Sequence, residues 1–498
     1  MPQKYYAMHD FHEYYSGARI APYLTIFVGG NHEASNYMWE LYYGGWVAPN
    51  IYYMGAANVI RLGPLRIAGL SGIWKGYSYK KPHYERLPYN QHDVKSIYHV
   101  RELDTRKLLQ IRSQVDIGIS HDWPRGVEWK GNYQQLFRFK PYFEQEAKDG
   151  TLGSVAAAKV LERLRPAHWF SAHMHVKYSA IWEHSDAQTS MAELKNAPQS
   201  RSVNASNLGS NLNGDPFEPP AKNEEEIDLD LDLDINDNIP PLAAVLSPND
   251  MSNNTGKNPG VPPTFEEVPQ DIRSLLPESF ARLSADTTAS LPFPQDITNK
   301  TTRFLALDKC LPNRNFLQLM EIAPISPAEI IRPLRLKYDL EWLAITRAFT
   351  NDLQVGDPNA QVPTDKGDAF YRPLIEQEME WVKTHIAKAE KLTIPEDFAQ
   401  TAHVFDPLLG INVNGTPQEY SNPHTQTFCD LLQIPNAFHA SDEERVRMMQ
   451  QGPRLESERA DRGGQRSRGQ GRGRGGRGGR GFNPNHVPVG RGRGRGQW

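Results

Sequence analysis

Side chains that bind metal ions or carry protons follow three hydrophobic runs of this 498-residue sequence. In chain order they are Asn31 and His32 after residues 25–28, His121 and Asp122 after residues 115–120, and His173 and His175 after residues 167–172. His173 and His175 stand two apart in an extended segment, so their imidazoles project to the same side, which suits chelation of a metal ion. Each motif alone also fits an ordinary role, such as a turn at GGNHE or a helix cap at SHDWP.

The runs that precede these side chains have the pattern of buried strands. Short apolar segments bounded by Gly, Pro or polar loops predict strands at residues 23–28, 50–54, 65–70, 115–120 and 167–172. Helical patterns lie between them, at residues 101–111 and 154–164, and Pro166 ends the second. Sites in α/β sheets form beyond the carboxyl ends of the strands. We therefore expect an α/β unit over residues 1–185 that gathers the polar side chains at one edge.

Composition limits the chemistry that this chain can perform. Only two cysteines are present, Cys310 and Cys429, which excludes a cysteine zinc ribbon and leaves His, Asn, Asp or Glu to hold any metal. No stretch of about 18 apolar residues occurs, so no membrane span is expected. The net charge of −4 conceals an asymmetry, since residues 461–498 contain ten arginines and one acidic residue. An acidic body with a basic tail indicates a polyanionic partner.

Changes in composition predict four segments. After the first unit, residues 186–300 are rich in Ser, Asn, Pro and Glu and contain EEEIDLDLDLDIND, which we interpret as a disordered acidic linker. A docking strand is the alternative for that segment. Strand- and helix-like patterns return over residues 301–445, which predict a second, smaller domain. Residues 446–498 form an Arg/Gly-rich tail with no capacity for a core.

In order and spacing, GNHE, SHD and HMH on one α/β chain resemble the calcineurin-like metallophosphoesterase superfamily. The resemblance implies a β-sandwich flanked by helices that holds two divalent metal ions, Fe²⁺, Zn²⁺ or Mn²⁺. Such ions activate water and neutralise phosphate oxygens, and imidazole and amide ligands suit them. The implied roles are metal ligands for Asn31, His121, His173 and His175, proton donor or charge stabiliser for His32, and orientation of imidazoles for Glu33 and Asp122. For the last two, ordinary loop caps are an equal alternative.

Longer stretches resemble the RNA lariat debranching enzyme family. They include APYLTIFVGGNHEASNY, RIAGLSGIWKGY, ISHDWPRGVEWKGN and WFSAHMHVKYSA in the first unit, and TTRFLALDKCLPNRNFLQLMEI in the second. The resemblance implies hydrolysis of the 2′–5′ phosphodiester at the branch point of excised intron lariat RNA, as part of mRNA processing in the nucleus. Splicing-associated proteins are further expected partners, through the acidic linker or the tail. Another dinuclear nuclease and a non-catalytic RNA-binding protein are the alternatives.

Aromatic and cationic residues are interleaved in a loop-rich insert at residues 71–101. Such interleaving suits stacking on splayed bases and pairing with phosphates. The candidate RNA-binding residues are Trp74, Lys75, Tyr84, Tyr98, His99 and Arg101. In the family this region corresponds to the loop that reads branched RNA. The alternative is that several of these aromatics pack the edge of the sheet.

Two motifs of the superfamily pattern are not found before Thr25. These are the D/C-x-H pair that follows the first strand and the G-D motif that supplies a bridging carboxylate. The resemblance therefore implies a first domain that lacks its N-terminal βαβ segment. It also leads us to expect that a chain starting at Met1 is unstable and nearly inactive, whereas a chain extended upstream is a working enzyme.

Overall fold

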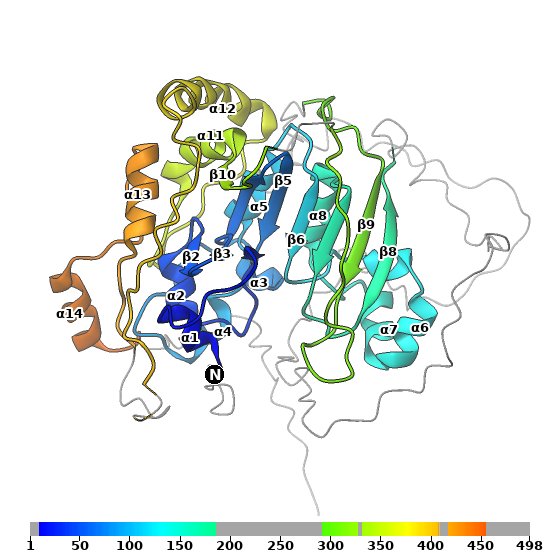
Figure 1. Ribbon diagram of the computed structural model, residues 1–498, viewed down its shortest axis with the longest axis horizontal. Coiled ribbons are helices and arrows are strands. Elements are labelled where there is room, and N and C mark those ends of the chain that lie inside the picture. Colours follow the sequence, from blue (N-terminus) through cyan, green and yellow to red (C-terminus); the bar gives the residue numbers. More distant parts are fainter. Residues whose placement is uncertain (1–8, 186–290, 327–330, 407, 409–416, 455–498) are drawn as a thin grey trace, which may run out of the picture. The chain divides into compact units, whose positions relative to one another are not determined.

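The computed structural model describes residues 9–185, 291–326, 331–406, 408 and 417–454 (Figure 1). Nearly all of the predicted acidic linker and the Arg/Gly part of the tail lie outside these residues. Helix α14, Asp442–Gln451, runs past the predicted boundary at residue 445. Among the residues described, no helix is both long enough and apolar enough to cross a membrane.

A seven-stranded mixed sheet forms the centre of the described structure (Figure 1). In spatial order its strands are β10 (Leu336–Tyr338), β4 (Ala57–Leu62), β5 (Leu65–Leu70), β6 (Ile117–Ser120), β7 (His168–Ser171), β9 (Thr301–Ala306) and β8 (Tyr178–Glu183). The four strands β5, β6, β7 and β9 run parallel, and the other three pair antiparallel. The carboxyl ends of the parallel strands therefore share one edge.

A smaller three-stranded sheet carries the first polar motif. Its order is β1 (Thr25–Phe27), β3 (Ile51–Tyr53) and β2 (Gly45–Ala48), with β1 and β3 parallel. The two sheets and their helices confirm the predicted α/β class of metallophosphoesterase type. The strands predicted around β1, β3, β5, β6 and β7 are confirmed: β5 has the predicted bounds, and the ends of the other four differ from the predicted ends by at most two residues.

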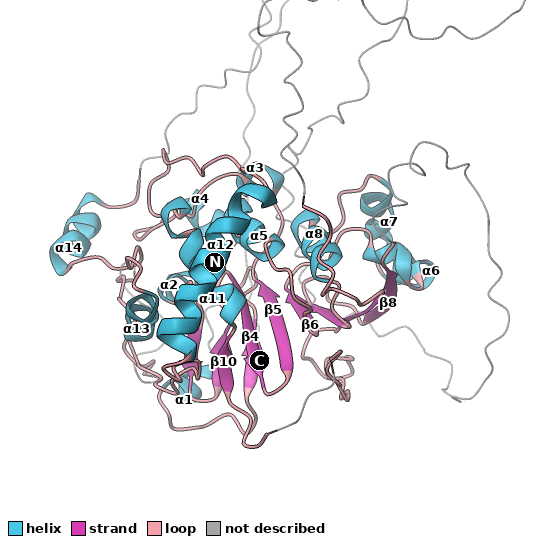
Figure 2. Cartoon of the chain, turned by 90° about the horizontal axis from the view of Figure 1, so that it is seen from above, coloured by secondary structure: helices cyan, strands magenta, loops and turns pink. Residues whose placement is uncertain are grey.

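Twelve α-helices are described outside the two sheets. They are α1 (Phe11–Tyr15), α2 (Ser35–Glu40), α3 (Gly76–Tyr79), α4 (Gln91–Ser96), α5 (Glu102–Leu109), α6 (Tyr133–Phe139), α7 (Pro141–Lys148), α8 (Val155–Leu164), α11 (Leu340–Ala348), α12 (Asp368–Val382), α13 (Pro423–Leu432) and α14. Helices α5, α8 and α11 lie on one face of the large sheet (Figure 2). Local contacts define both ends of α8. The Ser154 hydroxyl accepts a hydrogen bond from the Ala157 amide at the start, and Arg165, in the left-handed region, ends the helix before Pro166.

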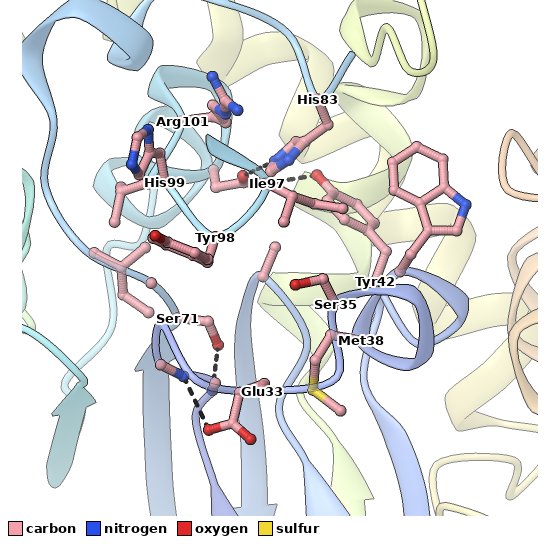
Figure 3. Close-up of a pocket in the computed structure, with 18 of the residues that line it drawn as sticks. Glu33, Ser35, Met38, Tyr42, Ser71, His83, Ile97, Tyr98, His99 and Arg101 are labelled. Carbon is pink, nitrogen blue, oxygen red and sulfur yellow. Dashed lines mark hydrogen bonds and ion pairs between the residues drawn. The ribbon is translucent and has the colours of Figure 1, made fainter. Parts of the chain in front are cut away.

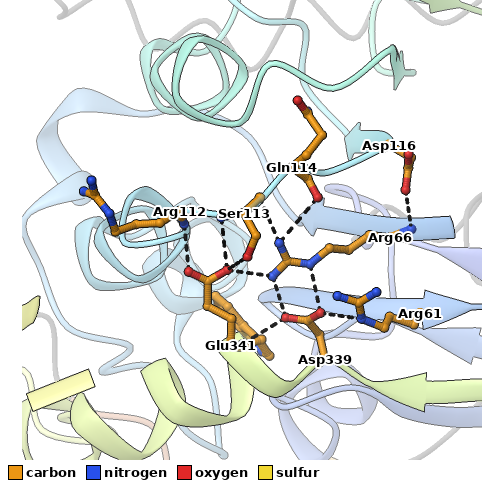
Figure 4. A network of polar contacts seen from close by, with 9 residues as sticks. Arg61, Arg66, Arg112, Ser113, Gln114, Asp116, Asp339 and Glu341 are labelled. Atoms are coloured by element: carbon orange, nitrogen blue, oxygen red, sulfur yellow. Dashed lines mark hydrogen bonds and ion pairs between the residues drawn. The ribbon is translucent and has the colours of Figure 1, made fainter. Parts of the chain in front are cut away.

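Residues from the second half of the chain complete the sheet of the first half. Strand β9 lies between β7 and β8, and β10 pairs with β4. Buried charges fasten this junction (Figure 4): Arg66 donates to both carboxylate oxygens of Asp339, at 2.8 and 2.6 Å, and to Glu341 at 3.0 Å. The sequence boundaries at 185, 300 and 445 stay a prediction, but the two ordered segments share one sheet.

Candidate metal centre

The loop after β1 is held against the end of β5. The Gly29 amide donates to the Ser71 hydroxyl at 3.0 Å, and the Gly72 amide donates to the Gly29 carbonyl at 2.8 Å. The first contact crosses from the small sheet to the large one. It brings Asn31 and His32 to the edge where β5, β6 and β7 end.

Asn31 and His121 meet at this edge. His121 Nε2 lies 3.1 Å from Asn31 Oδ1, and the His121 and His173 ring centroids are 5.0 Å apart. Gly30 makes this approach possible, because a Cβ at that position would stand 2.4 Å from His121 Cε1. Residues from the ends of β1, β6 and β7 are therefore brought together as the sequence predicts.

The HMH motif adopts a backbone that L-residues rarely take. His173 and His175 have φ angles of 58° and 52°, both in the left-handed region. Single non-glycine residues there carry strain of about 1–3 kcal/mol, and such strain concentrates at functional sites. The tight turn is closed by the Met174 amide, which donates to the Ala172 carbonyl at 2.7 Å.

The environment favours neutral imidazoles. Burial, followed by the charges of His173, His175 and His32, lowers the pKa of His121 to about 3. Burial likewise lowers the pKa of His175 to about 3, with help from Lys309, His173, Lys140 and His32. His32 is exposed, and its charge is the last-ranked cause of both shifts. Neutral imidazole is the form that binds metal ions.

The donor set fits a divalent ion, but its ligand shell is not closed. Two donors on one ion, each about 2.1 Å away, stand about 3.0–3.4 Å apart, which matches the 3.1 Å between His121 Nε2 and Asn31 Oδ1. Across the described ranges, however, no group of three or more His, Cys, Asp or Glu side chains is already arranged around one point. Asn31 and His121 thus form a preformed pair, with His173 adjacent.

The two predicted orienting carboxylates make backbone contacts. Glu33 accepts the Gly30 amide at 3.3 Å, and burial raises its pKa. Asp122 accepts the amides of Trp74 and Trp123 at 3.1 and 2.9 Å. Burial raises the pKa of Asp122, against the opposing charge of His173. Asp122 therefore lies near an imidazole and also ties the insert to the centre, whereas Glu33 shapes the loop.

The insert divides into half-buried and buried members. Trp74, Lys75, Tyr84 and Tyr98 are half-buried. His99 and Arg101 are buried, and Arg101 pairs with Glu85 while donating to the carbonyls of Ser78 and Ser96. In this conformation His99 and Arg101 shape the insert and do not reach a ligand at the surface. Arg101 and Arg454 also stand 5.5 and 5.4 Å from the centroid of the Tyr84 ring.

A pocket of about 70 Å³ lies between the loop after β1, helix α2 and the end of the insert (Figure 3). Glu33 and Ser71 lie at one end, and Tyr98, Tyr42 and His83 line it further on. This volume is several times smaller than that of a typical small-molecule site.

Two positioning residues escaped the sequence reasoning. Ser71 accepts the Gly29 amide and donates to the Gly55 carbonyl at 2.6 Å, and Gly30 admits the His121 ring. The available signal was the position of Ser71 at the end of a buried strand and of Gly30 directly before Asn31. Their partners are distant in sequence, so the role of each required the fold.

Comparisons with known proteins identify related sequences. Residues 299–437 match the family described as "Lariat debranching enzyme, C-terminal domain". The chain is 37% identical over 434 residues to the lariat debranching enzyme of Schizosaccharomyces pombe, covering 87% of this chain and 85% of that protein. It is 34% identical to the enzyme of that name from Arabidopsis thaliana, covering 89% and 75%, and 37% identical to that from Drosophila melanogaster, covering 87% and 68%. Since relatives this similar align with most of both chains, the protein belongs to the lariat debranching enzyme family.

Proposed function

We propose that this protein hydrolyses the 2′–5′ phosphodiester at the branch point of excised intron lariat RNA. The observation that carries the proposal is the meeting of Asn31, His121 and His173 at the ends of three strands, in a chain that aligns with debranching enzymes over most of its length. Water would add to phosphorus as the bond to the 2′ oxygen breaks. The products are a linear intron with a free 2′-hydroxyl and a 5′-phosphate.

Asn31, His121, His173 and His175 are the residues that would hold divalent ions. Such ions, when bound, lower the pKa of water and neutralise charge on phosphate oxygens. Fe²⁺, Zn²⁺ and Mn²⁺ suit imidazole and amide ligands. The left-handed backbone at His173 and His175 sets the direction in which the two side chains leave the chain.

His32 would give a proton to the departing 2′ oxygen. It is exposed and follows Asn31 directly, so a phosphate held at the edge would lie within its reach. Proton transfer of this kind contributes about 10²–10⁴-fold to a rate. Trp74, Lys75 and Tyr98 in the insert would contact the RNA near the branch, with Asp122 fixing the insert through the Trp74 amide.

The setting of the reaction is also a proposal. Intron turnover in mRNA processing places the protein in the nucleus. The Arg/Gly tail would add weak, salt-dependent RNA affinity or assist nuclear targeting. The acidic linker or the tail would recruit splicing-associated proteins.

A substrate panel tests the proposal. Branched RNA, linear RNA of the same composition and single-stranded DNA are incubated with the protein and Mn²⁺, and products are resolved by electrophoresis. Cleavage restricted to the branch, yielding a 5′-phosphate, is expected. Equal cleavage of linear RNA or DNA would instead identify a general nuclease, and binding without cleavage would identify a non-catalytic RNA-binding protein.

The His32→Ala variant separates catalysis from binding. Turnover is expected to fall by at least about a hundredfold, because the proton donor is lost, while affinity for branched RNA changes less than about threefold. His385→Ala is the matched control, since His385 is exposed on the far segment after α12 and stacks on Trp381. If affinity and turnover of His32→Ala fall together, His32 is a binding residue and not a proton donor.

A further inference from the structure

Four exposed aromatic side chains lie on neighbouring elements that the proposed function does not use. They lie on the short helix η2, Val127–Lys130, and on α6 and α7. Trp129 is 40% exposed, Tyr133 38%, Phe139 42% and Tyr142 73%. We call these four residues, with Lys130, Arg138 and Lys140, the aromatic platform.

The rings of the aromatic platform are partly ordered by one another. Trp129 and Tyr133 have centroids 5.3 Å apart, and both contact the buried Phe137, at 5.3 and 6.0 Å. Phe137 thus anchors two rings whose outer surfaces face solvent. Rings held in this way lose little conformational entropy when a flat ligand stacks on them.

The platform is fixed to the strand that begins just after His175. The Tyr178 hydroxyl donates to the Glu128 carbonyl at 2.6 Å, and Tyr178 stacks on Trp123 with centroids 5.2 Å apart. A Cβ on Gly131 would stand 2.3 Å from the Ser179 carbonyl oxygen, so the connection from η2 to α6 presses directly on β8. Tyr178 is three positions after His175, and Trp123 directly follows Asp122.

The charge of the platform suits a polyanion. From residue 127 to residue 143 the only acidic side chain is Glu128, which is buried, while Lys130, Arg138 and Lys140 are cationic. Further along, Lys148 donates to Glu144 at 2.7 Å and Gln145 donates to Asp149 at 2.9 Å.

Sheet order places the platform and the insert on different sides of the histidines. The insert follows β5, the histidines follow β6 and β7, and the platform rests on β8 at the edge of the sheet (Figure 1). A branched nucleotide carries three chains, attached through its 5′, 3′ and 2′ positions. If the insert binds the RNA on one side of the histidines, at least one of the three RNA chains is free to extend toward β8 on the other side.

We propose that the aromatic platform binds a single-stranded arm of branched RNA, stacking its bases on Trp129, Tyr133, Phe139 and Tyr142 while the three cations contact its phosphates. The inference rests on the proposed function for its substrate. Stacking and charge read no particular base, so the platform would accept arms of differing sequence. Its effect would be to hold the branch over the histidines.

The test compares two branched RNAs, one with arms of eight nucleotides and one with arms trimmed to two. Binding is measured by fluorescence anisotropy of labelled RNA in EDTA, so that hydrolysis does not consume the ligand. Trp129→Ala/Tyr142→Ala is expected to weaken binding of the long-armed RNA by about tenfold or more, and to change binding of the trimmed RNA by less than twofold. Trp129→Phe/Tyr142→Phe keeps the rings and should restore the affinity.

Tyr23→Ala is the matched control, because Tyr23 is an 80% exposed tyrosine before β1. Arg138→Gln should lower the salt dependence of long-arm binding by about 0.7 in the logarithmic slope for each phosphate that the variant no longer neutralises. Unchanged long-arm affinity in the double alanine variant would overturn the inference and assign the platform to a protein partner. Equal decreases in affinity for both RNAs would also overturn it, since damage to the whole site would explain them.

These outcomes are separable from failure of the proposed function. If the unsubstituted protein cleaves neither RNA but loses long-arm affinity on substitution, the platform stands and the hydrolase assignment falls. If it cleaves trimmed branched RNA at a normal rate and the substitutions leave long-arm affinity unchanged, the hydrolase assignment stands and the platform falls.

Discussion

His121 Nε2 lies 3.1 Å from Asn31 Oδ1, although 90 residues separate them in the chain. Two features of the fold produce this contact. The loop after β1 is hydrogen-bonded to Ser71 at the end of β5, and β6, which precedes His121, runs parallel to β5. An imidazole that burial keeps neutral and an amide oxygen then share one space. The contact satisfies a ring nitrogen of the partly buried imidazole, and it holds two donor atoms at a separation that one divalent ion could bridge.

Removing either side chain should weaken metal binding. His121→Ala and Asn31→Ala are each expected to lower affinity for Mn²⁺ or Zn²⁺ by at least about tenfold to a hundredfold, the scale seen even for residues that only support metal ligands. Titration calorimetry on protein first stripped with EDTA measures the effect. His385→Ala should bind as the unsubstituted protein does. Unaltered affinity in both site variants would show that the metal centre lies elsewhere.

Substitution of Gly30 should act through His121. In Gly30→Ala the new methyl would stand 2.4 Å from His121 Cε1, so the ring must move, and metal affinity should fall about as far as in His121→Ala. The backbone itself accepts alanine, since Gly30 is not among the residues with positive φ. Calorimetry measures the affinity, and thermal unfolding monitors the fold.

The double variant Gly30→Ala/His121→Ala makes this test specific. Once the ring is gone the methyl has room, so the second substitution should add no further decrease in metal affinity, a non-additivity expected of residues in contact. Gly76→Ala is the control, because the nearest atom to its added methyl is 4.0 Å away. Additive decreases would mean that Gly30 acts independently of His121.

Local sequence patterns predict the candidate metal-binding side chains better than they predict the long-range contacts that position those side chains. Residue types and spacing pointed to Asn31, His121 and His173 because catalytic side chains follow buried strands, which short apolar runs reveal. The insertion of β9 between β7 and β8 was not predictable, since its pairing joins residues more than 100 positions apart and leaves no local pattern. The burial of Arg101 was not predictable from the sequence either. A stretch of alternating aromatic and cationic residues does not indicate which cation forms a buried ion pair, as Arg101 does with Glu85.

Loss of Asp339 should be strongly destabilising. Asp339 is fully buried, accepts from Arg66 and Arg61, and caps α11 by accepting the Trp342 amide at 3.1 Å. Burial would raise its pKa, but Arg66 and Arg61 lower it overall, so the carboxylate is charged. Asp339→Ala leaves the buried Arg66 guanidinium with less compensation, which costs about 3–5 kcal/mol.

Urea denaturation of the full chain measures this cost. Lys148→Ala provides the comparison, since its ion pair with Glu144 is exposed and contributes at most about 1 kcal/mol. Asp339→Asn should lie between the two, because it keeps a cap acceptor and loses the charge. Equal stability of Asp339→Ala and Lys148→Ala would show that the network in Figure 4 does not join the two halves of the chain energetically.

The buried carboxyl of Glu40 should make stability fall as pH rises. Burial raises its pKa from 4.5 to about 7, although Thr401 donates to it at 2.6 Å. Between these two values the folded state keeps a proton that the unfolded state has released, so the contribution to stability is complete below pH 4.5 and is lost as pH rises through 7. The shift corresponds to about 3 kcal/mol.

In Glu40→Gln this pH dependence is absent, so the variant should gain stability relative to the unsubstituted protein from about pH 5 to about pH 8, as measured by urea denaturation at each pH. Glu396→Gln, at an exposed position, should run parallel to the unsubstituted protein. A Glu40→Gln curve that is also parallel would mean that Glu40 ionises in the folded state as readily as in the unfolded chain.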